Sequence, residues 1–261
     1  LSVAENLAFP LRNRGLEKLE VSTRVKEVLT LLGMTGRGQQ QASSLNADDK
    51  QKISLGRGLV RTDVNAILFD EPLTVIDPHL KWQLRTELKK IHRQFGHTMI
   101  YVTHDQTEAL TFADQVVVMY EGSVVQIGTP QQLFDKPQHT FVGSFIGSPG
   151  MNIIRCGVDG SDAIIEGNRI PLHQSVTATG DGLELGIRPE HIQLSGSEGV
   201  SVEVTVVEDV GKHIVVRTRL AEQEIDVIVR EGTAIPERVF LKFDAAKLNL
   251  YQDSFLLDSD P

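Results

Sequence analysis

Cysteine is nearly absent from this chain: Cys156 is the only one among 261 residues, so no disulfide bond can form within it. A single cysteine is typical of a reducing compartment and excludes a zinc site built on several thiolates. Long apolar runs are also lacking, since no stretch approaches the roughly 18 consecutive apolar residues of a membrane span, and the first residues do not follow the pattern of a secretory signal. We therefore expect a cytoplasmic protein whose contact with any membrane is peripheral.

An excess of positive charge is missing as well. Lysine and arginine total 26 against 35 aspartate and glutamate residues, which gives a net charge of −9. Because a protein that holds a nucleic-acid backbone needs a basic surface, we expect no nucleic-acid partner. With 40% hydrophobic residues the chain has the composition of a folded globular protein. Its length indicates two domains, at roughly 100–200 residues per domain.

Helical spacing of apolar residues is found in three segments of the first half of the chain. These are Ser22 to Leu32 with Ser22 as the cap and Gly33 as the stop, residues 53–60, and Pro78 to Phe95 after the N-cap Asp77. In the second segment, Gly56-Arg-Gly58 indicates close helix packing rather than a phosphate-binding loop, because a third glycine and a preceding strand are missing.

Two short apolar runs, residues 66–69 and 99–102, are typical of fully buried strands of a parallel sheet. Asp70 and Glu71 follow the first run, and His104 follows the second. Because the carboxyl ends of parallel strands meet at one edge of a sheet, we expect these side chains to gather there. Carboxylates can hold a hard cation and order a water molecule, and a histidine can donate to a phosphate, as phosphoryl transfer requires. Solvated acids at a strand end are the alternative.

The second half of the chain has the pattern of shorter strands. Residues 116–119 and 124–127 flank a glycine turn and predict a hairpin, and Thr129-Pro130 begins a short helix. Beyond about Gly150, alternating apolar runs separated by turn residues predict an antiparallel barrel or sandwich. The glycine-rich residues 147–150 indicate a boundary, so we expect domains at residues 1–147 and 148–261.

Several motifs together resemble those of the nucleotide-binding subunit of an ABC transporter, in particular of importers of sugars, polyols and glycerol phosphate. They are Ile67-Leu-Phe-Asp-Glu-Pro-Leu73, Asp77, Tyr101-Val-Thr-His-Asp-Gln-Thr-Glu-Ala-Leu110, Gly128-Thr-Pro-Gln-Gln-Leu-Phe134, Phe141-Val-Gly-Ser-Phe-Ile-Gly-Ser-Pro-Gly-Met-Asn152 and Gly186-Ile-Arg-Pro-Glu-His191. The resemblance implies an α/β fold: the C-terminal part of a P-loop-type ABC ATPase domain, with its helical subdomain, followed by an all-β accessory domain of OB-like barrels.

The resemblance also implies roles for four residues. Asp70 would hold Mg²⁺ through water, Glu71 would polarise the attacking water, His104 would contact the γ-phosphate of ATP, and Asp77 would belong to a loop that crosses the interface between two ATPase subunits. The family's phosphate loop, its adenine-stacking aromatic residue and its glutamine loop would lie upstream, and no G-x-x-x-x-G-K-[S/T] motif occurs in the chain. We therefore expect that a preceding segment has been removed and that these residues alone are catalytically silent.

The family's Leu-Ser-Gly-Gly-Gln signature corresponds here to Leu45-Asn-Ala-Asp-Asp49. In the family this loop binds the γ-phosphate held by the opposite subunit, so Asn46, Ala47, Asp48 and Asp49 occupy a nucleotide-binding position. Asn46 can still donate a hydrogen bond. A carboxylate such as that of Asp48, about 4 Å from a phosphate charge, costs on the order of 4 kcal/mol at an effective dielectric constant of about 20. Two interpretations stay open: a homodimer that tolerates the change, or two different ATPase chains with one degenerate site.

The function that the resemblance implies is ATP hydrolysis that energises import of a sugar, a polyol such as glycerol, or glycerol phosphate through separate membrane subunits. The cofactors would be ATP and Mg²⁺. The partners would be a second ATPase subunit, the transmembrane permease subunits and, indirectly, a periplasmic or extracellular solute-binding protein, with the chain on the inner face of the cell membrane. A noncatalytic regulatory or solute-binding subunit with a degenerate ATP site is the alternative, and the retained Glu71 and His104 argue against it.

Overall fold

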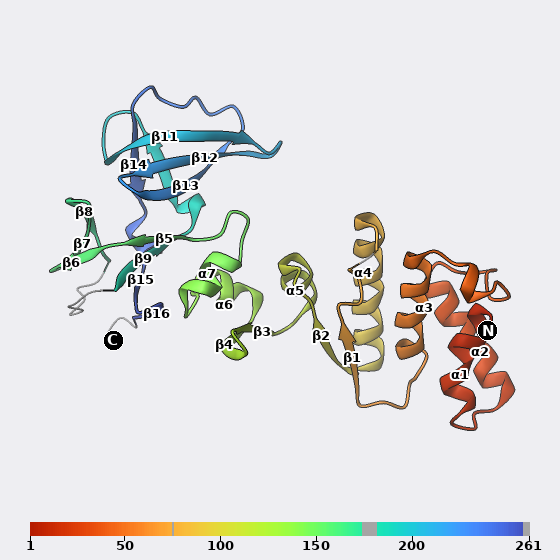
Figure 1. Cartoon of the computed structure of the whole chain (residues 1–261). Helices are drawn as coiled ribbons and strands as arrows, with labels where there is room; N and C mark the ends of the chain where they lie inside the picture. The colour runs from red at the N-terminus through yellow and green to blue at the C-terminus, as the bar shows by residue number, and fades with distance from the viewer. Residues whose placement is uncertain (75, 174–181, 258–261) are drawn as a thin grey trace. The chain divides into compact units, whose positions relative to one another are not determined.

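The computed structural model describes residues 1–74, 76–173 and 182–257 (Figure 1). Contacts divide the chain into two compact units, Leu1–Ala113 and Asp114–Pro261. This division falls earlier in the chain than the domain boundary expected after residue 147, because the hairpin and the two short helices that follow Asp114 group with the second unit. The domain boundary itself stays a prediction.

The first unit consists of helices and one two-stranded parallel sheet. Its elements in chain order are α1 (Val3–Arg12), α2 (Lys18–Leu31), the 3₁₀ turn η1 (Ala42–Ser44), α3 (Ala47–Leu59), β1 (Ala66–Asp70), α4 (Pro78–Phe95), β2 (Thr98–Val102) and α5 (Gln106–Phe112). Strands β1 and β2 pair in parallel, as the order strand, helix, strand predicts.

Helix α1 has no counterpart among the helices expected from the sequence. It begins with a capping box, in which Glu5 N donates to Oγ of Ser2 at 3.2 Å and Ser2 N donates to Oε2 of Glu5 at 2.6 Å. The pattern Ser-x-x-Glu at residues 2–5 was the available signal.

Helix α2 begins four residues before the expected cap, Ser22. Val21 is buried together with Val25 and Val28, so the apolar face already includes the turn that precedes Ser22. The expected stop is confirmed, because Gly33 follows the helix with a φ of 66°, a conformation that glycine adopts at little cost.

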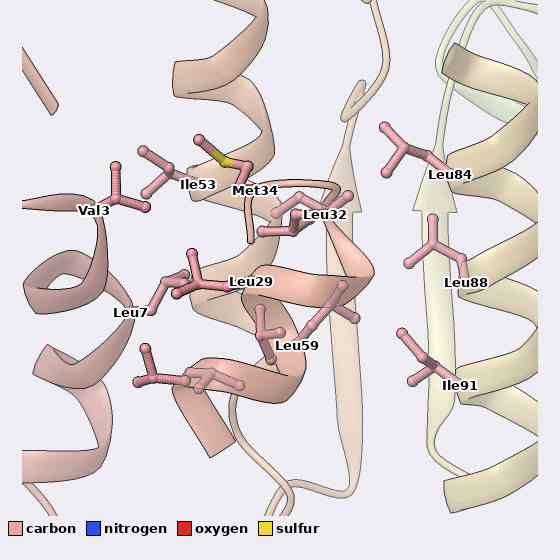
Figure 2. Packing of buried hydrophobic residues seen from close by; sticks show 14 of the residues in the cluster. Val3, Leu7, Leu29, Leu32, Met34, Ile53, Leu59, Leu84, Leu88 and Ile91 are labelled. Carbon is pink, nitrogen blue, oxygen red and sulfur yellow. The ribbon is translucent and has the colours of Figure 1, made fainter. Parts of the chain in front are cut away.

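One apolar core fills the first unit, and its buried residues come from α1, α2, α3, β1 and α4. Figure 2 shows Leu84, Leu88 and Ile91 projecting from one face of α4 into this core. The expectation that the strands are fully buried is wrong for the structure described: Ile67 and Phe69 are buried, whereas Leu68 between them is 72% exposed. Within this unit the two-stranded sheet is covered on one face.

The second unit consists mainly of antiparallel strands. Its elements are β3 (Val116–Tyr120), β4 (Ser123–Gly128), α6 (Pro130–Asp135), α7 (Thr140–Phe145), β5 (Asn152–Arg155), β6 (Gly157–Asp159), β7 (Asp162–Ile165), β8 (Asn168–Pro171), β9 (Leu183–Ile187), η2 (Pro189–His191), β10 (Ile192–Ser195), β11 (Val200–Asp209), β12 (His213–Leu220), β13 (Gln223–Arg230), β14 (Val239–Phe243), η3 (Ala245–Lys247), β15 (Asn249–Gln252) and β16 (Phe255–Leu256).

A five-stranded sheet in the order β10-β14-β11-β12-β13 is the largest sheet among the described residues. It curls so that its edge strands β10 and β13 contact each other, as in an OB-type barrel. The strands β16-β15-β9-β5 form a second sheet, and β3 pairs with β4 in the predicted hairpin. The predicted helix after Thr129 is also confirmed: it is α6, and it begins with a capping box between Thr129 and Gln132.

Arg188 connects the β-rich part of the second unit to α6 and α7. It is only 4% exposed, and its guanidinium donates to the carbonyl oxygens of Phe134, Gly143 and Ile146. These carbonyls lie at the C-terminal ends of the two helices, where a positive charge is favourable. Burial lowers the pKa of Arg188.

Candidate functional site

The carboxyl ends of β1 and β2 lie level with each other. The register pairs Asp70 with Val102, and Glu71 N donates to the carbonyl oxygen of Val102 at 2.9 Å. Just beyond these ends, Nδ1 of His104 lies 2.9 Å from Oε1 of Glu71. The expectation that Glu71 and His104 meet at one edge of the sheet is therefore confirmed, and the two side chains are in direct contact.

The contact between Glu71 and His104 shifts the pKa of both groups. Two hydrogen bonds lower the pKa of Glu71: the one from His104 has the larger effect, and the one from the Thr74 hydroxyl, at 3.1 Å, has a smaller effect. Glu71 in turn raises the pKa of His104. The two side chains are 44% and 70% exposed, so water screens their attraction. Since Nδ1 faces the carboxylate, Nε2 is the ring nitrogen that can meet a ligand.

Backbone strain accompanies this pair. Glu71 has a φ of 43°, a left-handed conformation that a residue with a side chain rarely adopts. The donation from Glu71 N to Val102 helps to hold it. Strain of this kind costs on the order of 1–3 kcal/mol and is concentrated at functional positions.

Asp70 and Asp77 are both exposed. Asp70 ends β1, and the carbonyl oxygen of Asp77 accepts from Lys81 N at 2.8 Å at the start of α4, which begins at Pro78 as predicted. No group of three or more histidine, cysteine, aspartate or glutamate side chains in the described part of the chain could hold a metal ion. One carboxylate such as that of Asp70 fits Mg²⁺, which commonly takes one or two carboxylates with waters and phosphate oxygens.

The loop at residues 46–49 forms the beginning of α3. Asn46 is the N-cap, and its Oδ1 accepts from Asp49 N at 2.8 Å, which leaves Nδ2 as the donor expected from the sequence. Ala47, Asp48 and Asp49 form the first turn of the helix, where acidic side chains are favourable.

Two cations pair with the acids of this loop. Arg37 donates through Nη1 to Oδ1 of Asp49 at 3.2 Å and through Nη2 to Oδ2 at 2.7 Å. Lys52 Nζ lies 2.9 Å from Oδ2 of Asp48 and 3.3 Å from Oδ1 of Asp49. The bond from Arg37 lowers the pKa of Asp49. Two positive charges thus balance two negative ones, so the repulsion of about 4 kcal/mol expected for an isolated carboxylate is an upper limit.

Sequence reasoning missed these cations and one buried acid. Lys52 lies three and four residues after the two aspartates, a spacing at which helical side chains meet, so it could have been found. Arg37 comes from a separate loop, and no local pattern points to it. Residues 105–108 read Asp-x-x-Glu, a pattern from which the sequence predicts that Glu108 is a capping partner of Asp105. Its side chain instead lies in a buried cluster, while Asp105 alone caps α5 through Thr107 N and Glu108 N.

Comparisons with known proteins agree with the architecture. A family model described as the MalK OB fold domain matches residues 147–192, and one described as the TOBE domain matches residues 185–250. The chain is 40% identical over 233 residues to the sn-glycerol-3-phosphate import ATP-binding protein UgpC of Escherichia coli. The aligned residues cover 87% of this chain and 65% of the relative. The chain is 37% identical over 231 residues to the sulfoquinovosyl glycerol transport ATP-binding protein SmoE of Agrobacterium fabrum, which covers 85% of this chain and 64% of the relative.

A third relative is matched along the whole chain. The sn-glycerol-3-phosphate import ATP-binding protein UgpC of Jannaschia sp. is 33% identical over 262 aligned positions, which cover 100% of this chain and 73% of the relative. By contrast, the chain spans just under two thirds of the length of the Escherichia coli and Agrobacterium proteins. The fold and the strand-end site define an α/β unit of ATPase type joined to a unit with an OB-like barrel. The chain belongs to the family of ABC transporter ATP-binding proteins.

Proposed function

We propose that the chain is part of an ATP-hydrolysing subunit that energises import of a sugar, a polyol such as glycerol, or glycerol phosphate. The observation that carries this proposal is the contact of 2.9 Å between Nδ1 of His104 and Oε1 of Glu71 at the carboxyl ends of two parallel strands. The names of the relatives, which describe transport of glycerol 3-phosphate and sulfoquinovosyl glycerol, support the class of solute.

In this proposal the chain's own residues divide the work. Glu71 stays ionised, because hydrogen bonds lower its pKa, and orients the attacking water. His104 is held by Glu71 through Nδ1 and presents Nε2 to the terminal phosphate. Asp77 lies at the start of α4, in a loop that faces a second ATPase subunit.

The cofactors proposed are ATP and Mg²⁺. Asp70 would hold the metal ion through water, and Mg²⁺ supplies neutralisation of phosphate charge when it is bound. The chain contains no G-x-x-x-x-G-K-[S/T] motif. Without the backbone amides and lysine of such a loop, we expect these 261 residues alone to bind ATP weakly and to hydrolyse none.

The partners proposed are a second ATPase subunit, the membrane permease subunits and, through them, an external solute-binding protein. The chain would therefore lie at the cytoplasmic face of the membrane. No helix within the described ranges is long and apolar enough to cross a bilayer.

A chimaera tests the proposal. The segment of Escherichia coli UgpC that precedes its match to this chain would be joined to residues 1–261, and phosphate release and glycerol 3-phosphate uptake would be measured in cells that lack UgpC. We expect ATP hydrolysis and restored uptake. Glu71→Gln should lower hydrolysis by at least about 100-fold, as loss of a general base does, while ATP binding remains.

The alternative of a noncatalytic regulatory or solute-binding subunit predicts a different result. The chimaera would then bind ATP without hydrolysing it, and Glu71→Gln would change neither binding nor uptake. Residues 1–261 without the added segment serve as the background control for both measurements.

A further inference from the structure

Glu108 is a buried carboxylate in the first turn of α5, with 2% of its surface exposed. Its Oε1 accepts from Lys81 Nζ at 3.1 Å. Its Oε2 accepts from the hydroxyls of Tyr101 at 2.9 Å and Thr103 at 3.0 Å. A buried carboxylate is tolerated only when its charge is balanced and its oxygens accept hydrogen bonds. This cluster meets both conditions with one cation and two hydroxyl donors.

The donors to Glu108 come from both segments that carry the strand-end pair. Tyr101 belongs to β2 and Thr103 directly precedes His104, whereas Lys81 belongs to the first turn of α4, the helix that follows Glu71 along the chain. Lys81 N also donates to the carbonyl oxygen of Asp77 at 2.8 Å. Glu108 therefore joins the segment after β1 to the turn after β2.

The residues on both sides of His104 are bonded within the same cluster. Thr103 Oγ1 donates to Glu108 and also accepts from Asp105 N at 3.0 Å. The Asp105 carboxylate then accepts from Thr107 N at 2.9 Å and from Glu108 N at 3.2 Å. The His104 side chain is 70% exposed, so packing does not hold its ring. The position of its backbone decides where the ring can reach.

We propose that Glu108 is a positioning residue, which gathers Lys81, Tyr101 and Thr103 so that the turn after β2 places His104 against Glu71. The catalytic meaning of that contact rests on the function proposed above, but the positioning itself does not. Burial is the main cause that raises the pKa of Tyr101, and the hydrogen bond to Glu108 raises it further. The Tyr101 hydroxyl therefore stays a donor throughout the usual pH range. Glu108 itself touches neither water nor phosphate in this scheme.

The test uses nuclear magnetic resonance on the 261-residue chain, with the His104 ring signals identified by their loss in His104→Gln. The readout is the nitrogen chemical shift of Nδ1 and the pH titration of the ring. Glu108→Asp keeps the charge but shortens the side chain, and Thr103→Val removes the hydroxyl without touching any charge. We expect the Nδ1 shift and the ring titration of His104 in both variants to move most of the way from the wild-type values to those of Glu71→Gln.

The matched control is Glu87→Gln, which removes a surface pair with Lys90 on α4 and should leave the His104 signals unchanged. Thr103→Val keeps the direct attraction between the charges of Glu108 and His104. A changed Nδ1 shift or ring titration in this variant therefore reports the position of His104 rather than the charge of Glu108. If Glu108→Asp does not fold, Thr103→Val and Tyr101→Phe carry the test.

A purely structural role for Glu108 has a distinct result. The variants would then melt at a lower temperature while the Nδ1 shift and the His104 titration stay as in the wild type, which would overturn the proposal. Because the readout needs no nucleotide, a chimaera that fails to hydrolyse ATP would refute the proposed function and leave this result standing.

Discussion

Arg37 and Asp49 form a two-point ion pair across twelve positions of the chain, with both guanidinium nitrogens on both carboxylate oxygens. Arg37 comes from the loop after α2, and Asp49 from the first turn of α3, where it is buried. Together with Lys52, this pair makes the start of α3 electrically balanced. The helix end therefore carries its own anions and its own cations.

This pair predicts a stability that depends on acid pH. The pKa of Asp49 is lowered in the folded state, so its stabilisation is full above the ordinary value of 3.8 and is lost as the pH falls through the lowered value. We expect Asp49→Asn to lower the free energy of unfolding by about 1–2 kcal/mol near neutral pH, since Arg37 is partly exposed and water screens the pair. Urea unfolding at about pH 6 and about pH 3 measures this.

Acid titrates other carboxylates too, so the Asp49 result is taken as a difference between variants. The difference in the free energy of unfolding between wild type and Asp49→Asn should be smaller at the lower pH. Glu87→Gln, which affects only an exposed pair on α4, should change stability by less than about 0.5 kcal/mol at either pH. A difference that stays constant with pH would contradict the role given to the Asp49 charge.

Gly56 and Gly58 in α3 predict opposite effects of alanine. A Cβ on Gly56 would lie 2.7 Å from Leu32 Cδ1 and 2.7 Å from Leu7 Cδ2, which is overpacking that costs about 1–3 kcal/mol. At Gly58 the nearest atom is 3.6 Å away, an ordinary contact. Alanine in a helix gains about 1 kcal/mol over glycine. We expect Gly58→Ala to stabilise the first unit and Gly56→Ala to destabilise it.

Thermal unfolding of the two glycine variants measures these opposite effects. The contacts of Gly56 agree with the interpretation of Gly56-Arg-Gly58 as close helix packing. Equal stabilisation by both alanines would show that the leucine side chains move aside freely.

The sequence was most informative where a pattern is local. The strand runs, the helix from Pro78 to Phe95 and the hairpin β3–β4 all follow from apolar spacing and from residues that cap or stop an element. The contact of Glu71 with His104 also followed, because parallel strand ends must meet.

Contacts between distant segments could not be predicted in the same way. Arg37 reaches Asp49 from a loop without regular spacing, and Lys81 reaches Glu108 across 27 positions. The exposed face of β1 was missed for a related reason. Alternation is invisible in a continuous apolar run, so Leu68 could not be told apart from its buried neighbours.

The two separate cores predict local effects of cavity-forming substitutions. Leu88 is 1% exposed in the core of the first unit, and Leu185 is fully buried in that of the second. Each change to alanine should cost about 2–5 kcal/mol. We expect hydrogen exchange to rise in residues 1–113 for Leu88→Ala and in residues 114–261 for Leu185→Ala, as mass spectrometry of peptides can measure. Equal acceleration in both units for either variant would indicate that they unfold as one.

Asp48 makes the most specific prediction about the second ATPase subunit. Its Oδ2 is paired with Lys52, whereas its Oδ1 is buried and has no hydrogen-bond partner among the described residues. A phosphate brought to the start of α3 would therefore meet a carboxylate that already occupies the favourable end of the helix. We expect the chimaera carrying Glu71→Gln to bind Mg-ATP and to dimerise only weakly in light scattering. Asp48→Gly should strengthen its ATP-dependent dimerisation at least about tenfold, or about 1.4 kcal/mol.

Lys50→Gly, at an exposed neighbouring position, is the control for flexibility. A homodimer that forms as tightly with Asp48 intact as with Asp48→Gly would contradict this prediction, because Lys52 and Arg37 would then neutralise the loop well enough for phosphate to bind.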